Sequence, residues 1–129
     1  MDVIERLAKG SDGLLFSSEA DYPLEPFLWS DPQPFSANAL YTLTKLPEST
    51  PITQVKFNEF FAPMVSLDPE ASEDAHNRVA RSKKLIRLLR RMFRELTVYK
   101  LGTIEMPTFI VGRLADGTIG GLRTTVVET

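Results

Sequence analysis

Residues 98–127, VYKLGTIEMPTFIVGRLADGTIGGLRTTVV, decide the fold of this chain. They hold three apolar runs rich in β-branched residues, a composition typical of strands. Two of these runs are separated by Asp116-Gly117, a dipeptide that predicts a tight hairpin turn. The sequence therefore predicts three consecutive strands, the last two joined as a hairpin. Their expected bounds are Val98–Leu101, Thr108–Leu114 and Thr118–Val127.

The last of these strands carries two further signals. Gly120-Gly121 indicates a bulge or a close approach of another backbone. Val126 and Val127 are neighbours, so their side chains point to opposite faces of the sheet. Because both are apolar, we expect both faces to be covered. This favours an α/β fold with helices on the two sides of a mostly antiparallel sheet.

The segment before these strands predicts one long helix. Asp68 is the expected N-cap, and Pro69 is the expected first helical residue, where its missing N–H costs nothing. Acidic residues follow in the early turns and basic residues in the later ones, the order that the helix dipole prefers. The apolar residues at helical spacing form the expected buried stripe. They are Val79, Ile86, Leu89, Phe93 and Leu96.

The N-terminal half predicts shorter elements. A first helix starts at an Asp2 cap with Glu5 three residues on, and Gly10 is its expected stop. Leu24–Trp29 predicts a strand, and Pro26 makes it an edge or bulged strand because proline cannot donate to a neighbour. The remaining expected elements are a loop at Pro32 and Pro34, a helix from a Ser36 cap to Lys45, a strand at Ile52–Phe57 and a helical turn at Asn58–Ala62.

The length of 129 residues fits one domain, 1–129. With no cysteine, the chain has no disulfide framework and no thiolate metal site. Its start lacks the pattern of a signal peptide, and its apolar runs are too short to cross a membrane. We therefore expect a cytoplasmic protein. The aromatic residues Trp29, Phe57, Phe60 and Phe61 are expected in the core.

The charge is distributed unevenly. Residues 78–94 carry eight Lys or Arg and no acid, so with a net charge of −2 the rest of the chain carries −10. As a structural feature, this segment is the solvated face of an amphipathic helix. As a functional feature, it would bind phosphates, which makes a nucleic-acid-binding module one alternative. Phe93 is the only aromatic residue in it, so the stacking platforms of single-strand binders are missing.

No catalytic set is visible. His76 is the only histidine and is expected to be a solvated helix residue, and the glycines match neither phosphate-loop spacing. We therefore expect a binding protein and not an enzyme. Several carboxylates gather early in the chain, either as a solubilising surface or as a patch that imitates a nucleic-acid backbone. They are Asp12, Glu19, Asp21, Glu25 and Asp31.

The last residues are unusual because a strand pattern runs to within two residues of the end. Most chain ends fray, but here the sheet is expected to hold the last residues, with Glu128 and Thr129 projecting from it. Thr129 would then present a hydroxyl and a carboxylate close together. Oxygen donors of this kind suit Mg²⁺.

Several short motifs, in one order along the chain, resemble the nuclease A inhibitor family. They begin near residue 11 and reach the last residue. They are Ser11-Asp12-Gly13-Leu14-Leu15-Phe16, Ser18-Glu19, Tyr22-Pro23, Phe27-Leu28-Trp29, Phe60-Phe61, Val98-Tyr99-Lys100-Leu101-Gly102 and Val126-Val127-Glu128-Thr129.

This resemblance implies a three-layer α/β/α sandwich of the type seen in pathogenesis-related-1-like proteins. It implies a non-enzymatic inhibitor of a sugar-nonspecific, Mg²⁺-dependent endonuclease. In this family the chain terminus, here Thr129, reaches the catalytic metal of the nuclease, and an acid after the first helix, here Glu19, engages the same site. Glu128 and, in the loop before the long helix, Leu67 and Asp68 are the other expected contacts.

The resemblance also implies the partners. The expected partner is the endonuclease, with no cofactor, no membrane and no direct contact to nucleic acid, and with a monomer when free. The only metal that Thr129 would meet is the Mg²⁺ of the nuclease. A nucleic-acid-binding module at 78–94 and a general protein-interaction domain of the same fold stay open as alternatives.

Overall fold

The computed structural model describes residues 2–29 and 35–129, and the chain forms one larger and one smaller antiparallel sheet. The larger sheet has the strand order β3-β7-β6-β5-β4, and each neighbouring pair is antiparallel. The smaller sheet is the hairpin of β1 and β2. The strands are β1 (Leu15–Ser17), β2 (Asp21–Pro23), β3 (Glu25–Leu28), β4 (Ile52–Lys56), β5 (Arg94–Leu101), β6 (Glu105–Arg113) and β7 (Ile119–Val127).

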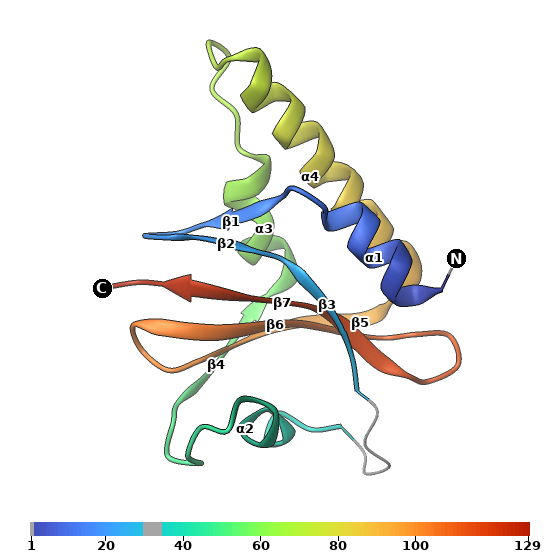
Figure 1. Cartoon of the computed structure of the whole chain (residues 1–129), viewed down its shortest axis with the longest axis vertical. Coiled ribbons are helices and arrows are strands. Elements are labelled where there is room, and N and C mark those ends of the chain that lie inside the picture. The colour runs from blue at the N-terminus through green and yellow to red at the C-terminus, as the bar shows by residue number, and fades with distance from the viewer. Residues whose placement is uncertain (1, 30–34) are drawn as a thin grey trace.

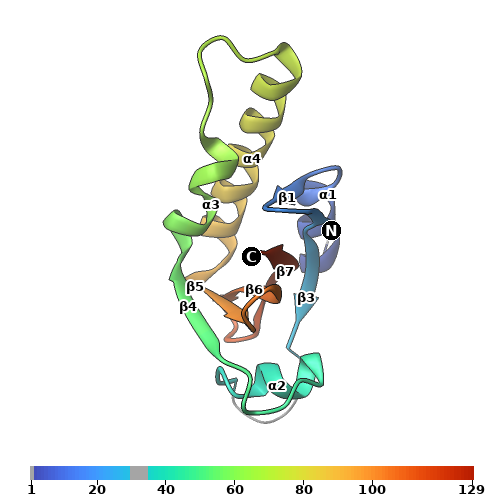
Figure 2. The same cartoon turned by 90° about the vertical axis from the view of Figure 1, so that its left-hand side faces the viewer.

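Helices lie on both sides of the larger sheet (Figure 1). Three of them, α1, α3 and α4, gather on one side, and α2 lies on the other (Figure 2). None of the helices in the described residues is long and apolar enough to cross a membrane. Their bounds are α1 (Val3–Ser11), α2 (Ala39–Thr44), α3 (Phe57–Val65) and α4 (Glu73–Met92).

The core has two parts, one on each face of the sheet. Ile110 and Leu122 point toward α1, α3 and α4, where they join the larger cluster. Phe109, next to Ile110 and therefore on the opposite face, packs with Leu40 of α2 in the smaller cluster. Both faces of the sheet are thus covered at β6. At the end of β7, Val126 is buried and Val127 is half-buried.

The long helix begins later than predicted. Asp68 and Pro69 lie in a turn before it, where Asp68 Oδ1 accepts a hydrogen bond from the N–H of Glu70. The N-cap is Ser72, whose Oγ accepts from the N–H of Ala75 at 3.2 Å. Asp68 and Ser72 both have side chains that suit an N-cap. Only Ser72 lies three residues before an N–H of the first turn of α4, that of Ala75, and accepts from it.

The end of this helix was also predicted too late. Met92 is its last residue, so Phe93 is the C-cap and Leu96 belongs to β5. Val79 and Leu89 are buried as expected, and Ile86 is half-buried. Leu85 is buried as well and was missed. Phe93 lies in the core. Leu96 packs against the core from strand β5 and not from the helix.

In α1 the predicted start is confirmed and the predicted stop is wrong. Asp2 Oδ1 accepts a hydrogen bond from the N–H of Glu5 at 2.8 Å. The helix continues through Gly10 to Ser11. Gly10 allows α1 to pack closely on α4, since a Cβ there would lie 2.9 Å from Leu88 Cδ2. The chain reverses at Gly13, which has a φ of +74°.

Two more helices differ from prediction. Ser36 does not cap α2, which begins at Ala39 and has no side-chain cap. It ends at Thr44, and Lys45 follows with a left-handed φ of 59°. The predicted turn at Asn58–Ala62 is a longer helix, α3, since Phe57–Val65 buries three aromatic residues on one face. The predicted strand before it, β4, is confirmed and ends at Lys56.

The predicted strands are confirmed with longer bounds for β5 and β6. Strand β3 is an edge strand, as Pro26 predicts. At the β6–β7 turn, Asp116 Oδ1 accepts from the N–H of Thr118 at 2.9 Å, which lowers the pKa of Asp116. Gly120-Gly121 is a close backbone approach and not a bulge, because the register with β6 continues through it. The β1–β2 hairpin was not predicted. The predicted loop at Pro32 and Pro34, and Asp31, lie outside the described residues.

Candidate functional site at the end of the last strand

Strand β7 ends against the loop that joins β1 to β2. The N–H of Val127 donates to Ser18 Oγ at 2.9 Å, and the N–H of Glu19 donates to the carbonyl of Val127 at 3.1 Å. On the other side, the N–H of Glu128 donates to the carbonyl of Ile104 at 2.9 Å. The last residues are therefore held by hydrogen bonds, as the strand pattern led us to expect.

The same loop brings Glu19 to Thr129. The Thr129 hydroxyl donates to Glu19 Oε1 at 2.7 Å, and the Thr129 N–H donates to the other carboxylate oxygen. Both residues are exposed. The sequence nominated each of them separately, but nothing in it indicated that they touch, because 110 positions separate them.

Glu128 is fixed by a cation. Its Oε1 lies 2.9 Å from Lys100 Nζ, and the Lys100 side chain is only 17% exposed. Because Lys100 is largely covered, this pair is screened less by water than an ordinary surface pair. Lys100 stands on β5 and was not singled out as a site residue; only the sheet brings it beside the end of β7.

These residues surround a shallow hollow of about 450 Å³. Its apolar lining includes Phe16, Phe60 and Val126, all buried. Its polar lining holds three carboxylate side chains against one lysine, so the hollow is acidic with several oxygen donors. The charged side chains are Glu19, Glu59, Glu128 and Lys100, and Ser17, Ser18 and Thr129 complete the polar lining.

Leu67 and Asp68 do not line this hollow. They line a neighbouring one, together with the exposed Leu15 of the hairpin. Ser17 and Pro63 line both hollows, so the two meet at the β1–β2 hairpin. The five predicted contacts thus fall into two groups. Glu19, Glu128 and Thr129 line one hollow, and Leu67 and Asp68 line the other. Leu67 is half-buried and Asp68 is exposed.

Ser18 emerges as a positioning residue that the sequence did not nominate. Replacing Ser18 with Ala leaves the N–H of Val127 without its acceptor, which should cost about 1 kcal/mol of folding stability and about 4 °C in melting temperature. Ser17→Ala, at an exposed neighbouring position, is the control and should change stability by less than about 0.5 kcal/mol. Equal melting temperatures for the two variants would contradict this role.

The described residues offer no catalytic set. His76 is exposed in the first turn of α4, and no group of three or more His, Cys, Asp or Glu among residues 2–29 and 35–129 could hold a metal ion. Phe57, Phe60 and Phe61 are core residues as expected, and Trp29 is half-buried. The structure therefore adds no support for catalysis.

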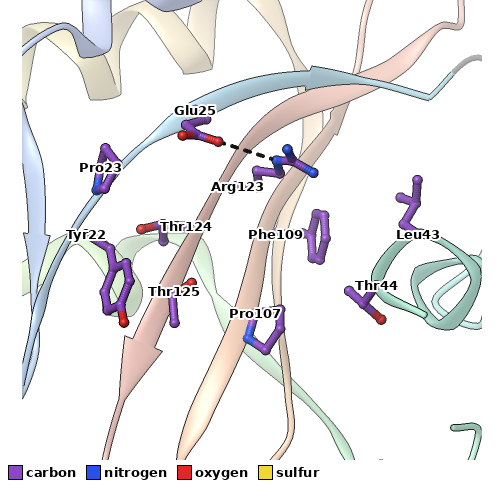
Figure 3. Close-up of a pocket in the computed structure, with 10 residues that line it drawn as sticks. All are labelled: Tyr22, Pro23, Glu25, Leu43, Thr44, Pro107, Phe109, Arg123, Thr124 and Thr125. Atoms are coloured by element: carbon purple, nitrogen blue, oxygen red, sulfur yellow. Dashed lines mark ion pairs between the residues drawn. The ribbon is translucent and has the colours of Figure 1, made fainter. Parts of the chain in front are cut away.

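A third pocket lies on the α2 side of the sheet (Figure 3). Its walls include Tyr22, Phe109 and Leu43, and on one wall Glu25 of β3 pairs with Arg123 of the neighbouring strand β7 at 3.7 Å. This ion pair neutralises one member of the predicted acidic cluster. None of the five predicted nuclease contacts lines this pocket.

Known proteins were compared with the chain. A scan against protein-family models matches residues 1–129, the whole chain, to the family described as nuclease A inhibitor-like protein. A search of curated proteins found no match.

Proposed function

Because this chain belongs to the nuclease A inhibitor-like family, we propose that it is a protein inhibitor that blocks the active site of a sugar-nonspecific, Mg²⁺-dependent endonuclease. Its partner is then a protein, and the chain itself performs no catalysis. The contact between Glu19 and Thr129 is the observation that carries the proposed mechanism.

This contact supplies a prearranged set of oxygen atoms. In a polypeptide that ends at residue 129, Thr129 carries a hydroxyl and a main-chain carboxylate, and Glu19 holds this residue through two hydrogen bonds. A group that is already ordered loses little conformational entropy on binding, which favours tight association. Each carboxylate oxygen of Glu19 keeps a free lone pair, so Glu19 can still accept from the nuclease.

The target of these oxygens is the catalytic metal. Mg²⁺ prefers oxygen ligands and holds the scissile phosphate in such nucleases. Thr129 would occupy the position of a phosphate oxygen on the metal of the nuclease. The inhibitor needs no metal or cofactor of its own for this step.

The surrounding charge favours a cationic partner. The hollow around Thr129 has three acidic side chains and one lysine, whereas a cleft that binds DNA is positively charged. Opposite potentials speed association and orient the partners before contact. Leu67 and Asp68, with the exposed Leu15, line the adjacent hollow and form the proposed flanking contact.

The finer features of the fold belong to the same proposal. Helices on both sides of an antiparallel sheet support a three-layer α/β/α sandwich of the pathogenesis-related-1-like type, with residues 1–129 as one domain. We propose a monomer in the cytoplasm as the free state. A general protein-interaction domain remains the alternative, but no described feature favours another protein target.

Neutralising Glu19 tests the role of its charge. Glu19→Gln keeps one oxygen acceptor for Thr129 but removes the negative charge, so inhibition should weaken by about tenfold, mainly through slower association. Association and dissociation rates measured at two salt concentrations would check this. Glu48→Gln, at an exposed position outside both hollows, is the matched control and should inhibit like the parent chain. An unchanged association rate for Glu19→Gln would contradict the steering argument.

The function itself is tested by titrating the untagged chain against a Mg²⁺-dependent, sugar-nonspecific nuclease from the same source. Stoichiometric loss of nuclease activity is the expected result. A folded chain that leaves the nuclease fully active at a large excess would overturn the proposed function.

A further inference from the structure

Helix α4 presents a basic face away from the core. Its buried residues Leu85 and Leu89 join the larger core cluster, and from Arg81 to Arg91 the sides of the helix turned away from that cluster carry exposed cations. We call this surface the basic face. It comprises Arg81, Lys83, Lys84, Arg87, Arg90 and Arg91.

No acid of the described chain neutralises the basic face. The ion pairs within residues 2–29 and 35–129 are Lys100–Glu128, Arg113–Glu95 and Arg123–Glu25, none of which involves α4. Two of the six side chains have neutral partners instead: Arg81 donates to the carbonyl of Asp12, and Arg90 donates to Asn58 Oδ1. The remaining four have no acidic partner.

This arrangement costs the helix stability. Lys83 and Arg87 stand four residues apart, as do Arg87 and Arg91, and like charges at this spacing repel each other. The helix dipole favours cations only in the last turn, which includes Arg90 and Arg91 but neither lysine. The helix dipole therefore accounts for Arg90 and Arg91 but not for Lys83, Lys84 and Arg87, whose mutual repulsion an anionic partner would relieve.

The basic face is separate from the hollow at Thr129. The two surfaces lie against different sides of α3: Glu59, Phe60 and Pro63 line the hollow, whereas Asn58 and Phe61 line the groove beside α4. Figure 1 shows the chain end and the second half of α4 on opposite sides of the molecule. A ligand on one surface leaves the other accessible.

We propose that the basic face binds the phosphate backbone of a double-stranded nucleic acid. Four of its six side chains are arginines, which bind phosphate oxygens in pairs. From Arg81 to Arg91 the helix rises by about 15 Å. A duplex carries a phosphate for about every 1.7 Å of its axis, so several phosphates are within reach. This goes beyond the expectation from the family resemblance, which involved no nucleic acid.

Two features favour this ligand over others. The exposed large apolar side chains of the described chain are Ile4, Leu15, Leu28, Leu43 and Ile104, none of them on α4. In the groove beside the basic face, Phe57, Phe61 and Ile86 are buried or half-buried, so they offer a protein partner little apolar surface. It also lacks exposed aromatic rings, on which a single strand would stack its bases. Backbone contacts of a duplex need neither.

The test is fluorescence anisotropy with a 20-base-pair DNA duplex, a duplex RNA of the same length, a single strand and a poly-glutamate peptide. With about four phosphate contacts, affinity for the duplex should fall about 100-fold between 50 and 200 mM salt. Arg87→Glu with Arg91→Glu should lower it by about 30-fold or more. Lys45→Glu with Arg123→Glu makes the same charge change on the α2 side and should change it less than about threefold.

Circular dichroism checks the fold of each variant, and Arg87→Gln with Arg91→Gln replaces the reversal if it fails to fold. Binding of either duplex supports the proposal, and comparison of the two identifies DNA or RNA as the source of the phosphates. No duplex binding at 50 mM salt, equal losses in the two double variants, or tighter binding of the single strand or the poly-glutamate would overturn it. Nuclease inhibition should be unaffected by the α4 variants, so this test stands apart from the proposed function.

Discussion

A chain that lacks Thr129 should need at least about 30-fold higher concentration for half-inhibition of the nuclease, since residues that anchor an interface contribute more than about 2 kcal/mol each. The deletion removes the hydroxyl that donates to Glu19, shifts the main-chain carboxylate to Glu128 and leaves Glu19 without either partner. The oxygens proposed to meet the metal are then absent or misplaced. A titration of nuclease activity against each chain measures the effect.

Two variants separate the parts of this effect. A short Gly-Ser extension keeps the Thr129 side chain and its bonds to Glu19 but removes the carboxylate at residue 129, so it should also lose most inhibition. Thr129→Ser keeps both the hydroxyl and the carboxylate and should inhibit within about threefold of the parent. The deletion should leave the melting temperature nearly unchanged, because residue 129 is exposed. Full inhibition by the chain that lacks Thr129 would contradict the proposal that this residue reaches the metal of the nuclease.

Gly121→Ala should destabilise the fold by about 4 kcal/mol or more, among the largest effects of a single substitution. A Cβ at this position would lie 1.9 Å from the carbonyl oxygen of Ile110, and the backbone φ is +152°. The neighbouring strand β6 cannot move away without losing its pairing with β7. The melting temperature should fall by about 15 °C, measured by thermal denaturation.

Gly117→Ala is the matched control. Gly117 also has a positive φ, of +90°, but an added Cβ would have no atom within 4 Å. It therefore reports the backbone strain alone, about 1 to 2 kcal/mol. Similar losses for the two variants would show that strain, and not the contact with β6, sets the cost at Gly121.

Local patterns predicted most of the elements. The three C-terminal strands, the Asp116-Gly117 turn and the edge position of β3 follow from apolar runs of β-branched residues, from turn residues and from a proline that cannot donate. The predicted helix ends were less accurate. Asp68 and Ser72 both suit an N-cap, and the structure uses Ser72. Gly10 suits a helix end, but it lies inside α1, where it allows close packing on Leu88 of α4.

The β1–β2 hairpin shows why some elements escape prediction. Each strand has only three residues, too few for an alternating pattern to stand out. Its stability comes from tertiary packing, for example from Phe16, which stacks on Phe60 with ring centroids 4.3 Å apart. Such a contact between distant positions has no signature in either segment alone.

The sequence by itself determined the strand and helix types, the concentration of positive charge in residues 78–94 and the identity of Glu19 and Thr129 as candidate residues. Only the tertiary structure decided that these two residues touch, that Ser18 and Lys100 support them, and that Leu67 and Asp68 lie beside a separate hollow. The physical reason is range. Secondary structure follows from neighbours within a few residues, whereas the site joins positions about 110 residues apart, which meet only after the sheet has formed.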